Sequence, residues 1–445
     1  LRPVRPREAL ARWCTDSAVN LAVMRVSVGA VVLAMQEIHT LSVEATRLPL
    51  AVRTPPAGWA WAMRALPVTP SLAEGLRAVV LASALTGALG LFSRTSFAAL
   101  TLAGAVLWAQ AMTLGSAIHL HHLLWLSALL AVSPCGDAIS LDRKVFHRAS
   151  APPSVAYGLP LRAAWMLLGA VYLFPGLWKL RTSGLAWVLS DNLLLHMRAK
   201  WFQMQGFTPL FRVDRVPWLC RVGAGLTVAF ELSFWLLVLP RRTRAAAVVV
   251  ALLFHQATDA FMGLRYPALW CTYALFFDLR RPLGRVFDVT ETPGLQRDAR
   301  AVGVAAAGLL AGAVTLGAAG ESDAWPFACY PKFDRLGPTA LPVLEVVAVT
   351  DAGEVPVDDR AMFPAGRTQR YWALTWSLMG AHRSERASNA RFAALWSSVG
   401  RRPAVRAATA NARAVRFYRA LASTDPDHPA ALGRALLGEI TVTRR

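Results

Sequence analysis

Apolar residues in this chain gather in long runs, and short, strongly basic stretches separate them. A bilayer crossing needs roughly 17 to 20 apolar residues in a helix, and the pattern predicts nine segments. They are 18–38, 75–92, 96–115, 117–134, 162–180, 222–239, 244–262, 266–279 and 301–319. The eighth is short, and we expect it to be half-buried or re-entrant. We expect the first to remain as a span and not to be removed as a signal peptide.

The composition supports a membrane protein. Hydrophobic residues make up 55% of the chain and charged residues 17%, and the mean hydropathy is +0.40. One soluble core could not bury that much apolar surface. We therefore expect an all-α polytopic protein of the inner membrane, with a cytoplasmic segment at 1–17 and a transmembrane domain at 18–319. The frequent use of alanine and arginine is typical of a GC-rich bacterial genome.

The formal net charge of +20 does not form one aromatic-rich patch, so we expect no nucleic-acid partner. It lies in clusters between apolar runs, as the positive-inside rule produces, and the predicted order of spans puts most clusters on one, cytoplasmic, face. These clusters are Arg2, Arg5, Arg7 and Arg12; Arg143, Lys144 and Arg148; the turn "PRRTR"; and the loop "DLRRPLGR". The loop 181–221 is also basic but falls outside, where we expect it to fold at the membrane interface.

The residues after the last span, 320–445, are expected to form a small extracytoplasmic α+β domain. "LEVVAVTDAGEVPVDD" predicts a strand, a turn and a second strand. Helices are expected over 373–399 and 403–422. The five cysteines show no metal-ligand spacing, so we expect no metal site. Cys220 and Cys329 fall on the outer side, where they could pair or stay free.

Ionisable side chains inside apolar spans are costly, and each is therefore a functional candidate. Arg25 lies about one turn into the first span, where we expect it to form a structural ion pair with Glu231 or to reach the membrane surface. His255 and Asp259 are four residues apart and share a helical face, so the carboxylate could orient the imidazole. No third ligand accompanies that pair, which argues against a metal.

Histidines begin the fourth segment in "IHLHHLLWL". His119 and His122 could simply cap the helix or lie among the lipid headgroups. His121 shares a face with Trp125, four residues later, and is the stronger candidate for a site.

Lys179 ends the fifth segment, and the chain has only four lysines. It could anchor the helix end at the membrane surface with its amine in water. Alternatively, apolar surroundings would disfavour its charged form and leave a neutral amine to act as a base. Arginine cannot take that role because it stays protonated. The choice of lysine therefore favours proton chemistry.

Four stretches in order resemble one family. "LAVMRVSVGAVVL", "HHLLWLSALLAVSPCGDAISLDR", "VYLFPGLWKL" with Trp187 after it, and "FHQATDAFMG" are similar to the HTTM (horizontally transferred transmembrane) domain. Vitamin K-dependent γ-glutamyl carboxylase shares that domain. The likeness covers about residues 15 to 280 and implies a membrane-embedded helical fold with an outward-facing site.

The resemblance also implies roles for residues. The family's base is a lysine in a G-x-K-K-L setting, which matches Lys179 here, with Trp178 in place of the preceding lysine. His121 and His255 match catalytic histidines, and Glu231 matches an acid that precedes the second of them. The implied cofactor is reduced vitamin K or menaquinol, whose epoxidation drives carboxylation of an exported protein substrate. The tail is shorter than the carboxylase's and differs in pattern.

Two other functions stay open. The chain could be a non-catalytic protein of the lipid bilayer that binds or matures an exported partner through the basic, Trp-bearing helices of its tail. Transport is less favoured, because transporters often contain two related halves and none is visible here.

Overall fold

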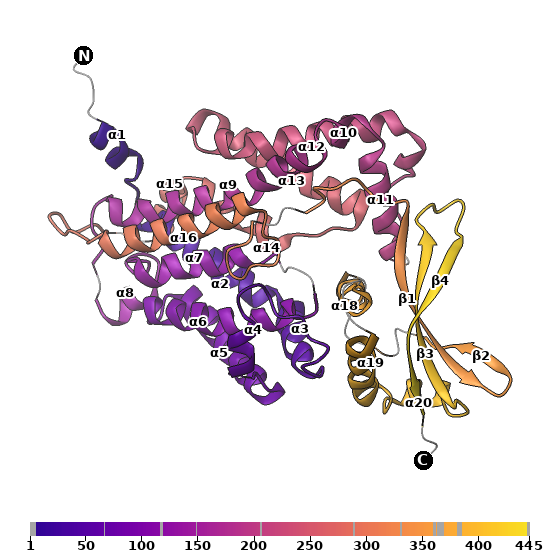
Figure 1. Cartoon of the computed structure of the whole chain (residues 1–445). Coiled ribbons are helices and arrows are strands. Elements are labelled where there is room, and N and C mark those ends of the chain that lie inside the picture. The colour runs from indigo at the N-terminus through magenta and orange to yellow at the C-terminus, as the bar shows by residue number, and fades with distance from the viewer. Residues whose placement is uncertain are drawn as a thin grey trace.

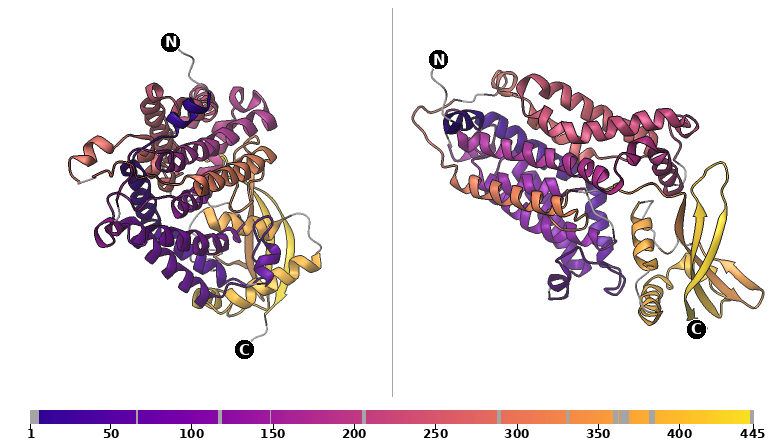
Figure 2. Two further views of the ribbon diagram at one scale, coloured as in Figure 1. Left: turned by 90° about the vertical axis from the view of Figure 1, so that its left-hand side faces the viewer. Right: turned by 45° about the horizontal axis from the view of Figure 1, so that its top comes forward.

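The structure is a computed structural model that describes residues 6–65, 67–115, 119–147, 149–204, 207–287, 290–329, 332–358, 362, 369–380 and 385–442. It consists of a helical bundle and a smaller module that contains one antiparallel sheet (Figure 1). The module lies at the end of the bundle away from the N-terminus in both figures that show the whole chain (Figures 1 and 2).

Six helices of the described chain are long and apolar enough to cross a membrane. They are α5 (Pro70–Leu89), α6 (Ser93–Met112), α9 (Val155–Ser183), α12 (Pro217–Val238), α13 (Arg241–Met262) and α16 (Arg300–Ala319). A seventh span results if α2 (Ala18–Ala34) and α3 (Gln36–Thr46), which are bent by 53° at their junction, are counted together. Of the nine predicted apolar segments, six or seven therefore correspond to helices long enough to span a membrane in the described chain.

The two remaining predicted spans are short. The fourth corresponds to α7 (His121–Val132), a 12-residue helix that is buried over most of its length inside the bundle. The eighth is α14 (Pro267–Trp270) followed by the 3-10 turn η2 (Cys271–Phe276), and its shortness agrees with the prediction. Neighbouring helices cover these segments, so their apolar residues pack in the protein core.

The predicted basic clusters meet at the end of the bundle opposite the module. Arg241 of "PRRTR" lies 3.6 Å from Asp278 of "DLRRPLGR". Arg143 donates to the carbonyl of Thr290 at 3.2 Å. Short helices here are α1 (Pro6–Trp13), α8 (Leu141–Val145) and α15 (Arg280–Gly284). Three predicted members, Arg2, Arg5 and Arg148, lie outside the described residues.

The end of the bundle next to the module contains several short helices of one long loop. The basic loop 181–221 contains α10 (Ala186–Leu189), α11 (Asn192–Gln203) and the 3-10 turn η1 (Val213–Arg215). These elements pack against α12 and α13 through a small apolar cluster that includes Leu194, Trp201 and Met262. Helix α4 (Ala60–Ala65) lies between α3 and α5 in the chain.

The module contains a four-stranded antiparallel sheet of order β2-β1-β3-β4. Its strands are β1 (Ala340–Thr350), β2 (Gly353–Pro356), β3 (Ala414–Ser423) and β4 (Ala431–Thr441), and its helices are α18 (Gln369–Met379), α19 (Glu385–Val399) and α20 (Pro403–Ala408). The predicted hairpin is present as β1 and β2. The helix expected over 403–422 is wrong beyond Ala408, because β3 pairs with β1 along ten residues and this ladder outweighs local helix propensity.

Side chains from several elements fix the module to the bundle. Arg391 donates to the carbonyls of Ala51 at 2.9 Å and Val52 at 3.0 Å. Trp372 is 5% exposed and donates its indole N–H to the carbonyl of Gln203 at 2.8 Å. Trp372 therefore belongs to an internal contact, although the sequence had offered the Trp-bearing helices as a surface for a partner.

The connector 320–339 follows the bundle closely. Trp125 donates to the carbonyl of Pro326 and Trp187 to that of Phe333, both at 2.6 Å. The N–H of Gly337 donates to Asn192 Oδ1 at 2.6 Å. The first residues of the predicted outer domain are thus part of the bundle surface.

Candidate functional site

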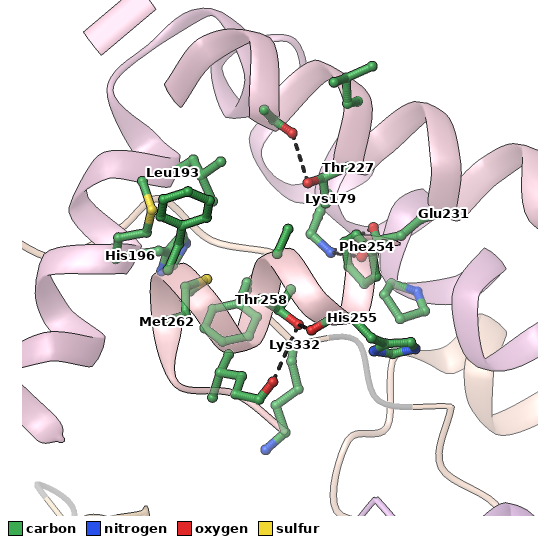
Figure 3. Close-up of a pocket in the computed structure, with 18 of the residues that line it drawn as sticks. Lys179, Leu193, His196, Thr227, Glu231, Phe254, His255, Thr258, Met262 and Lys332 are labelled. Atoms are coloured by element: carbon green, nitrogen blue, oxygen red, sulfur yellow. Dashed lines mark hydrogen bonds and ion pairs between the residues drawn. The ribbon is translucent and has the colours of Figure 1, made fainter. Parts of the chain in front are cut away.

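A cavity of about 450 Å³ lies at the module end of the bundle. Helices α9, α11, α12 and α13 and the connector line it, and most of the lining side chains are apolar (Figure 3). The lining residues with polar groups used below are Tyr172, Lys179, His196, Glu231, His255 and Lys332. An apolar pocket with a few convergent polar groups is the usual form of a small-molecule site.

Lys179 and Glu231 form a buried ion pair in the cavity wall. Lys179 Nζ lies 2.6 Å from Glu231 Oε1 and 2.7 Å from Oε2, and the residues are 3% and 6% exposed. The two side chains extend toward one another from α9 and α12 (Figure 3). Two charges in an apolar interior are tolerated only with such a partner. The amine proposed from the sequence as an isolated base is therefore one half of a pair.

Local sequence brings these two helices together. Gly176 precedes Lys179 by three residues, and a Cβ at this position would meet Glu231 Cβ at 2.9 Å. The absence of a side chain thus allows α9 and α12 to approach where the pair forms. The Lys179 amine also lies 5.3 Å from the ring centre of Trp187, a geometry of cation–π attraction.

A second polar cluster borders the same cavity through Tyr172 and His255. His255 Nε2 lies 2.6 Å from the Tyr172 hydroxyl and 3.0 Å from the Tyr273 hydroxyl. The two tyrosine hydroxyls also contact one another. His255 is 4% exposed, and its Nδ1 has no hydrogen-bond partner among the described residues. This cluster was not predicted, because the sequence paired His255 with an acid on its own helix.

That predicted partnership is wrong. Asp259 instead binds Arg265, with Nε 2.9 Å from Oδ1, and its side chain is 32% exposed. Residues four apart on a helix can share a face, but the Asp259 carboxylate has a solvent-accessible arginine within reach. His255 turns to the buried tyrosines.

Arg25 does not pair with Glu231, contrary to the prediction. It is fully buried and donates to three backbone carbonyls, those of Cys135 at 2.8 Å, Ala138 at 3.1 Å and Ile139. These carbonyls belong to the turn after α7, at the end of the bundle opposite the cavity. Arg25 therefore has a structural role, but with different partners.

His121 lies outside the lining of the cavity. Its Nε2 is 3.1 Å from the carbonyl of Ala324, and its ring packs edge-on against Trp325 with centroids 4.6 Å apart. The neighbouring residues His119 and His122 line the cavity instead. His122 Nε2 lies 2.9 Å from the carbonyl of Ala268. Of the three predicted catalytic residues, Lys179 and His255 line the same cavity, and His121 does not.

Two further lysines mark the connector side of the site. Lys332 lines the cavity on the side away from Lys179 (Figure 3), and Lys200 lies 5.5 Å from the ring centre of Phe333. Burial, together with the nearby charge of Lys332, lowers the pKa of Lys200 to about 8. Three of the four lysines in the chain thus lie in or beside the site. Their scarcity was the signal that could have found all three.

His196 borders the cavity from α11, outside the long apolar helices. Its Nε2 lies 2.9 Å from the carbonyl of Arg335. Burial lowers the pKa of its imidazole to about 4, against a smaller opposing effect of that carbonyl. His196 is therefore a neutral hydrogen-bonding group at neutral pH.

The described residues contain no group of three metal-ligating side chains. Cys220 and Cys329, which could have paired, are both free and buried. Their thiols donate to the carbonyls of Val213 and Ala313 at 3.4 Å each. The site can therefore offer proton transfer and hydrogen bonding to a largely apolar ligand.

Comparison of the chain with protein families, with curated proteins and with solved structures gives no match.

Proposed function

We propose that the chain is an integral membrane enzyme that acts on a quinol-type lipid, with the Lys179–Glu231 pair as the proton acceptor. The observation that carries this proposal is the buried ion pair in the wall of an apolar cavity. Ion pairs inside a membrane domain are costly and usually functional. The resemblance to the HTTM family independently favours Lys179 as the base.

The residues of the cavity fit a ring-bearing lipid. The walls supplied by Phe254, Phe261 and Leu226 are apolar, and Leu226 is also 67% exposed on the outside of α12. Polar contacts come from the ion pair and from His255, whose Nδ1 lacks a partner within the described part of the chain. A reduced quinone would supply two hydroxyl groups and two electrons when bound. Such hydroxyls suit polar groups that converge at one side of an apolar chamber.

Within the pair, the short contact between Nζ and both carboxylate oxygens lets a proton move between the two side chains. One proton can therefore be accepted while the other half of the pair remains in hydrogen-bond contact. Trp187 covers the amine and helps to exclude water. General base catalysis of this kind contributes roughly 100- to 10,000-fold to a rate.

The resemblance extends the proposal to a carboxylase- or epoxidase-like reaction on an exported protein. The clustering of basic residues at the end opposite the module supports a cytoplasmic location for that end. The module and the connector side of the cavity would then face outward, where an exported substrate is available. Reduced vitamin K and menaquinol are the two cofactors that the resemblance suggests.

The test is quinol-dependent turnover of purified protein in proteoliposomes. With dioxygen supplied as the oxidant, Lys179→Met should reduce oxidation of menaquinol or vitamin K hydroquinone at least 100-fold, whereas Lys144→Met, an exposed lysine at the basic end, should not. A melting curve of each variant separates lost chemistry from lost folding. Wild-type turnover in a folded Lys179→Met protein would refute the proposal.

One observation favours the non-catalytic alternative. Strand β4 is an edge strand of the sheet that the described residues form, and Leu432 and Leu436 on it are 58% and 54% exposed. An exposed edge can accept an added strand from another polypeptide. If Leu432→Lys with Leu436→Lys abolished the physiological role while Lys179→Met preserved it, the alternative would be favoured over the enzyme.

A further inference from the structure

The cluster of Tyr172, His255 and Tyr273 fixes where the imidazole carries its proton. The described neighbours of His255 Nε2 are the two tyrosine hydroxyls, at 2.6 Å and 3.0 Å. A hydroxyl can donate one proton and can also accept. A neutral imidazole donates from one nitrogen and accepts at the other. Counting protons therefore separates the two tautomers.

If Nε2 accepts, both hydroxyl protons are used. One tyrosine donates to Nε2, and the second donates to the oxygen of the first, with which it is in contact. The one group left over is an N–H at Nδ1. All three buried polar atoms at the centre of the cluster are then satisfied.

If Nε2 instead carries the proton, it cannot accept from either tyrosine. It donates to one hydroxyl, and that hydroxyl donates to the next. One tyrosine proton then has no acceptor within the cluster, and Nδ1 is an unused acceptor. This tautomer leaves two buried groups unsatisfied instead of one, and each unsatisfied buried group disfavours it.

We propose that Tyr172 and Tyr273 are positioning residues that hold His255 in the Nδ1–H tautomer, so that His255 donates a hydrogen bond to an acceptor oxygen of the cavity ligand. This inference rests on the proposed function for the identity of the ligand as a quinone-type lipid. His255 Nδ1 is the one polar atom of the cluster without a partner among the described residues, and it has almost no accessible surface, so the ligand oxygen reaches it by displacing the side chains beside it. His255 lines the cavity and is only 4% exposed. Neighbouring side chains therefore hold the imidazole in place, as donor groups of a preorganised site are held.

The cavity wall then contains two polar groups with different roles. The Lys179–Glu231 pair is a proton acceptor, whereas His255 is a donor that keeps its proton. Tyr172 is on α9, seven residues before Lys179, so the same helix supplies one member to each group. A ligand with oxygens at two positions of a ring could contact both.

The first test reads the tautomer without any ligand. Protein with ¹⁵N-labelled histidine in lipid nanodiscs should show the His255 signals of a protonated Nδ1 and an unprotonated Nε2, assigned by their loss in His255→Gln. Tyr172→Phe combined with Tyr273→Phe should shift His255 toward the Nε2–H form. Tyr266→Phe is the matched control, since its ring packs 5.7 Å from His255 without a hydrogen bond to it in the described structure. A protonated Nε2 in the wild type would overturn the inference, whatever the protein's activity.

The second test reads the ligand contact. A ¹³C-labelled naphthoquinone carbonyl bound to the wild type should show an infrared band at lower frequency than in Tyr172→Phe with Tyr273→Phe. An unchanged carbonyl band would overturn the donor role of His255. If no quinone binds but the tautomer is as expected, the proposed quinone function fails while the assignment to the tyrosines stands.

Discussion

Arg25 and Lys179 are both buried cations of the helical bundle, and their surroundings differ in two respects. Arg25 is enclosed by the carbonyls of a turn and borders no part of the cavity. Lys179 faces a carboxylate and lines the cavity. Carbonyls can hold a guanidinium but cannot exchange a proton with it, whereas a carboxylate and an amine can share one. Burial alone therefore does not separate a structural cation from a candidate site residue, and the partner and the adjoining cavity distinguish the two.

The largest effect is expected when Arg25 is removed. Arg25→Met should abolish recovery of folded protein, because it leaves three buried carbonyls without donors, at roughly 1–3 kcal/mol each. Size-exclusion chromatography in detergent would measure the monodisperse fraction. Arg47→Met is the control, since that arginine is 56% exposed in its ion pair with Glu44. Normal recovery of Arg25→Met would show that Arg25 is not a structural lock.

Lys179 should behave differently, because its partner can be removed with it. Glu231→Leu leaves an unpaired buried charge and should reduce the free energy of unfolding by about 3–5 kcal/mol. Adding Lys179→Met should restore most of that loss, since apolar residues can replace a buried pair. Thermal melting in detergent measures both. A double variant no more stable than Glu231→Leu would contradict the pairing.

Lys200 extends the comparison to a cation whose described partners are an amide, Gln203, and the ring of Phe333. Its folded-state pKa of about 8 lies below the ordinary value of 10.5, so between these values the unfolded chain binds more protons. Stability should then rise as pH increases from about 8 to 10.5. Lys200→Gln should be more stable than the wild type at pH 7, and the difference should vanish at the upper end. Melting temperature against pH checks this, with Lys144→Gln as control; a constant difference would contradict it.

The smallest effect is expected at the surface. Arg212 binds Asp427 with Nη2 2.8 Å from Oδ2, and the side chains are 29% and 37% exposed. Asp427→Asn should lower stability only slightly, because exposed pairs are screened by water and salt. Limited proteolysis of the module at low and high salt would measure it. Asp351→Asn, at a more exposed pair within the module, is the control, and a salt-independent loss would indicate another cause.

The sequence was sufficient for features that depend on local pattern. Runs of apolar residues located the long helices, and the rarity of lysine pointed to Lys179. The sequence did not reveal which charged residues on different helices pair with one another. Glu231 was available to either Arg25 or Lys179 in the sequence, and only the packing of α9 on α12 at Gly176 decides between them. The same limit explains the Asp259 error.

The sequence also did not reveal which side of a helix faces the cavity. His121 and His122 are adjacent, yet successive helical residues point about 100° apart, so one packs on Trp325 and the other lines the cavity. No spacing rule reveals which face meets a cavity that other helices build. In the module, the expected helix over 403–422 failed because β1, about 70 residues earlier, recruits β3 into a ladder. Such non-local pairing is absent from any local window.

The connector between α16 and β1 has a practical consequence. Lys332 and Phe333 belong to the roof of the chamber, and Trp187, which covers the Lys179 amine, is itself tethered to the connector backbone. In a protein shortened after Ala319 the cavity would thus be open to solvent, and water would reach the Lys179 amine. Grafting a different tail onto the same spans would replace this part of the cavity wall, and would therefore change which ligands can enter the cavity.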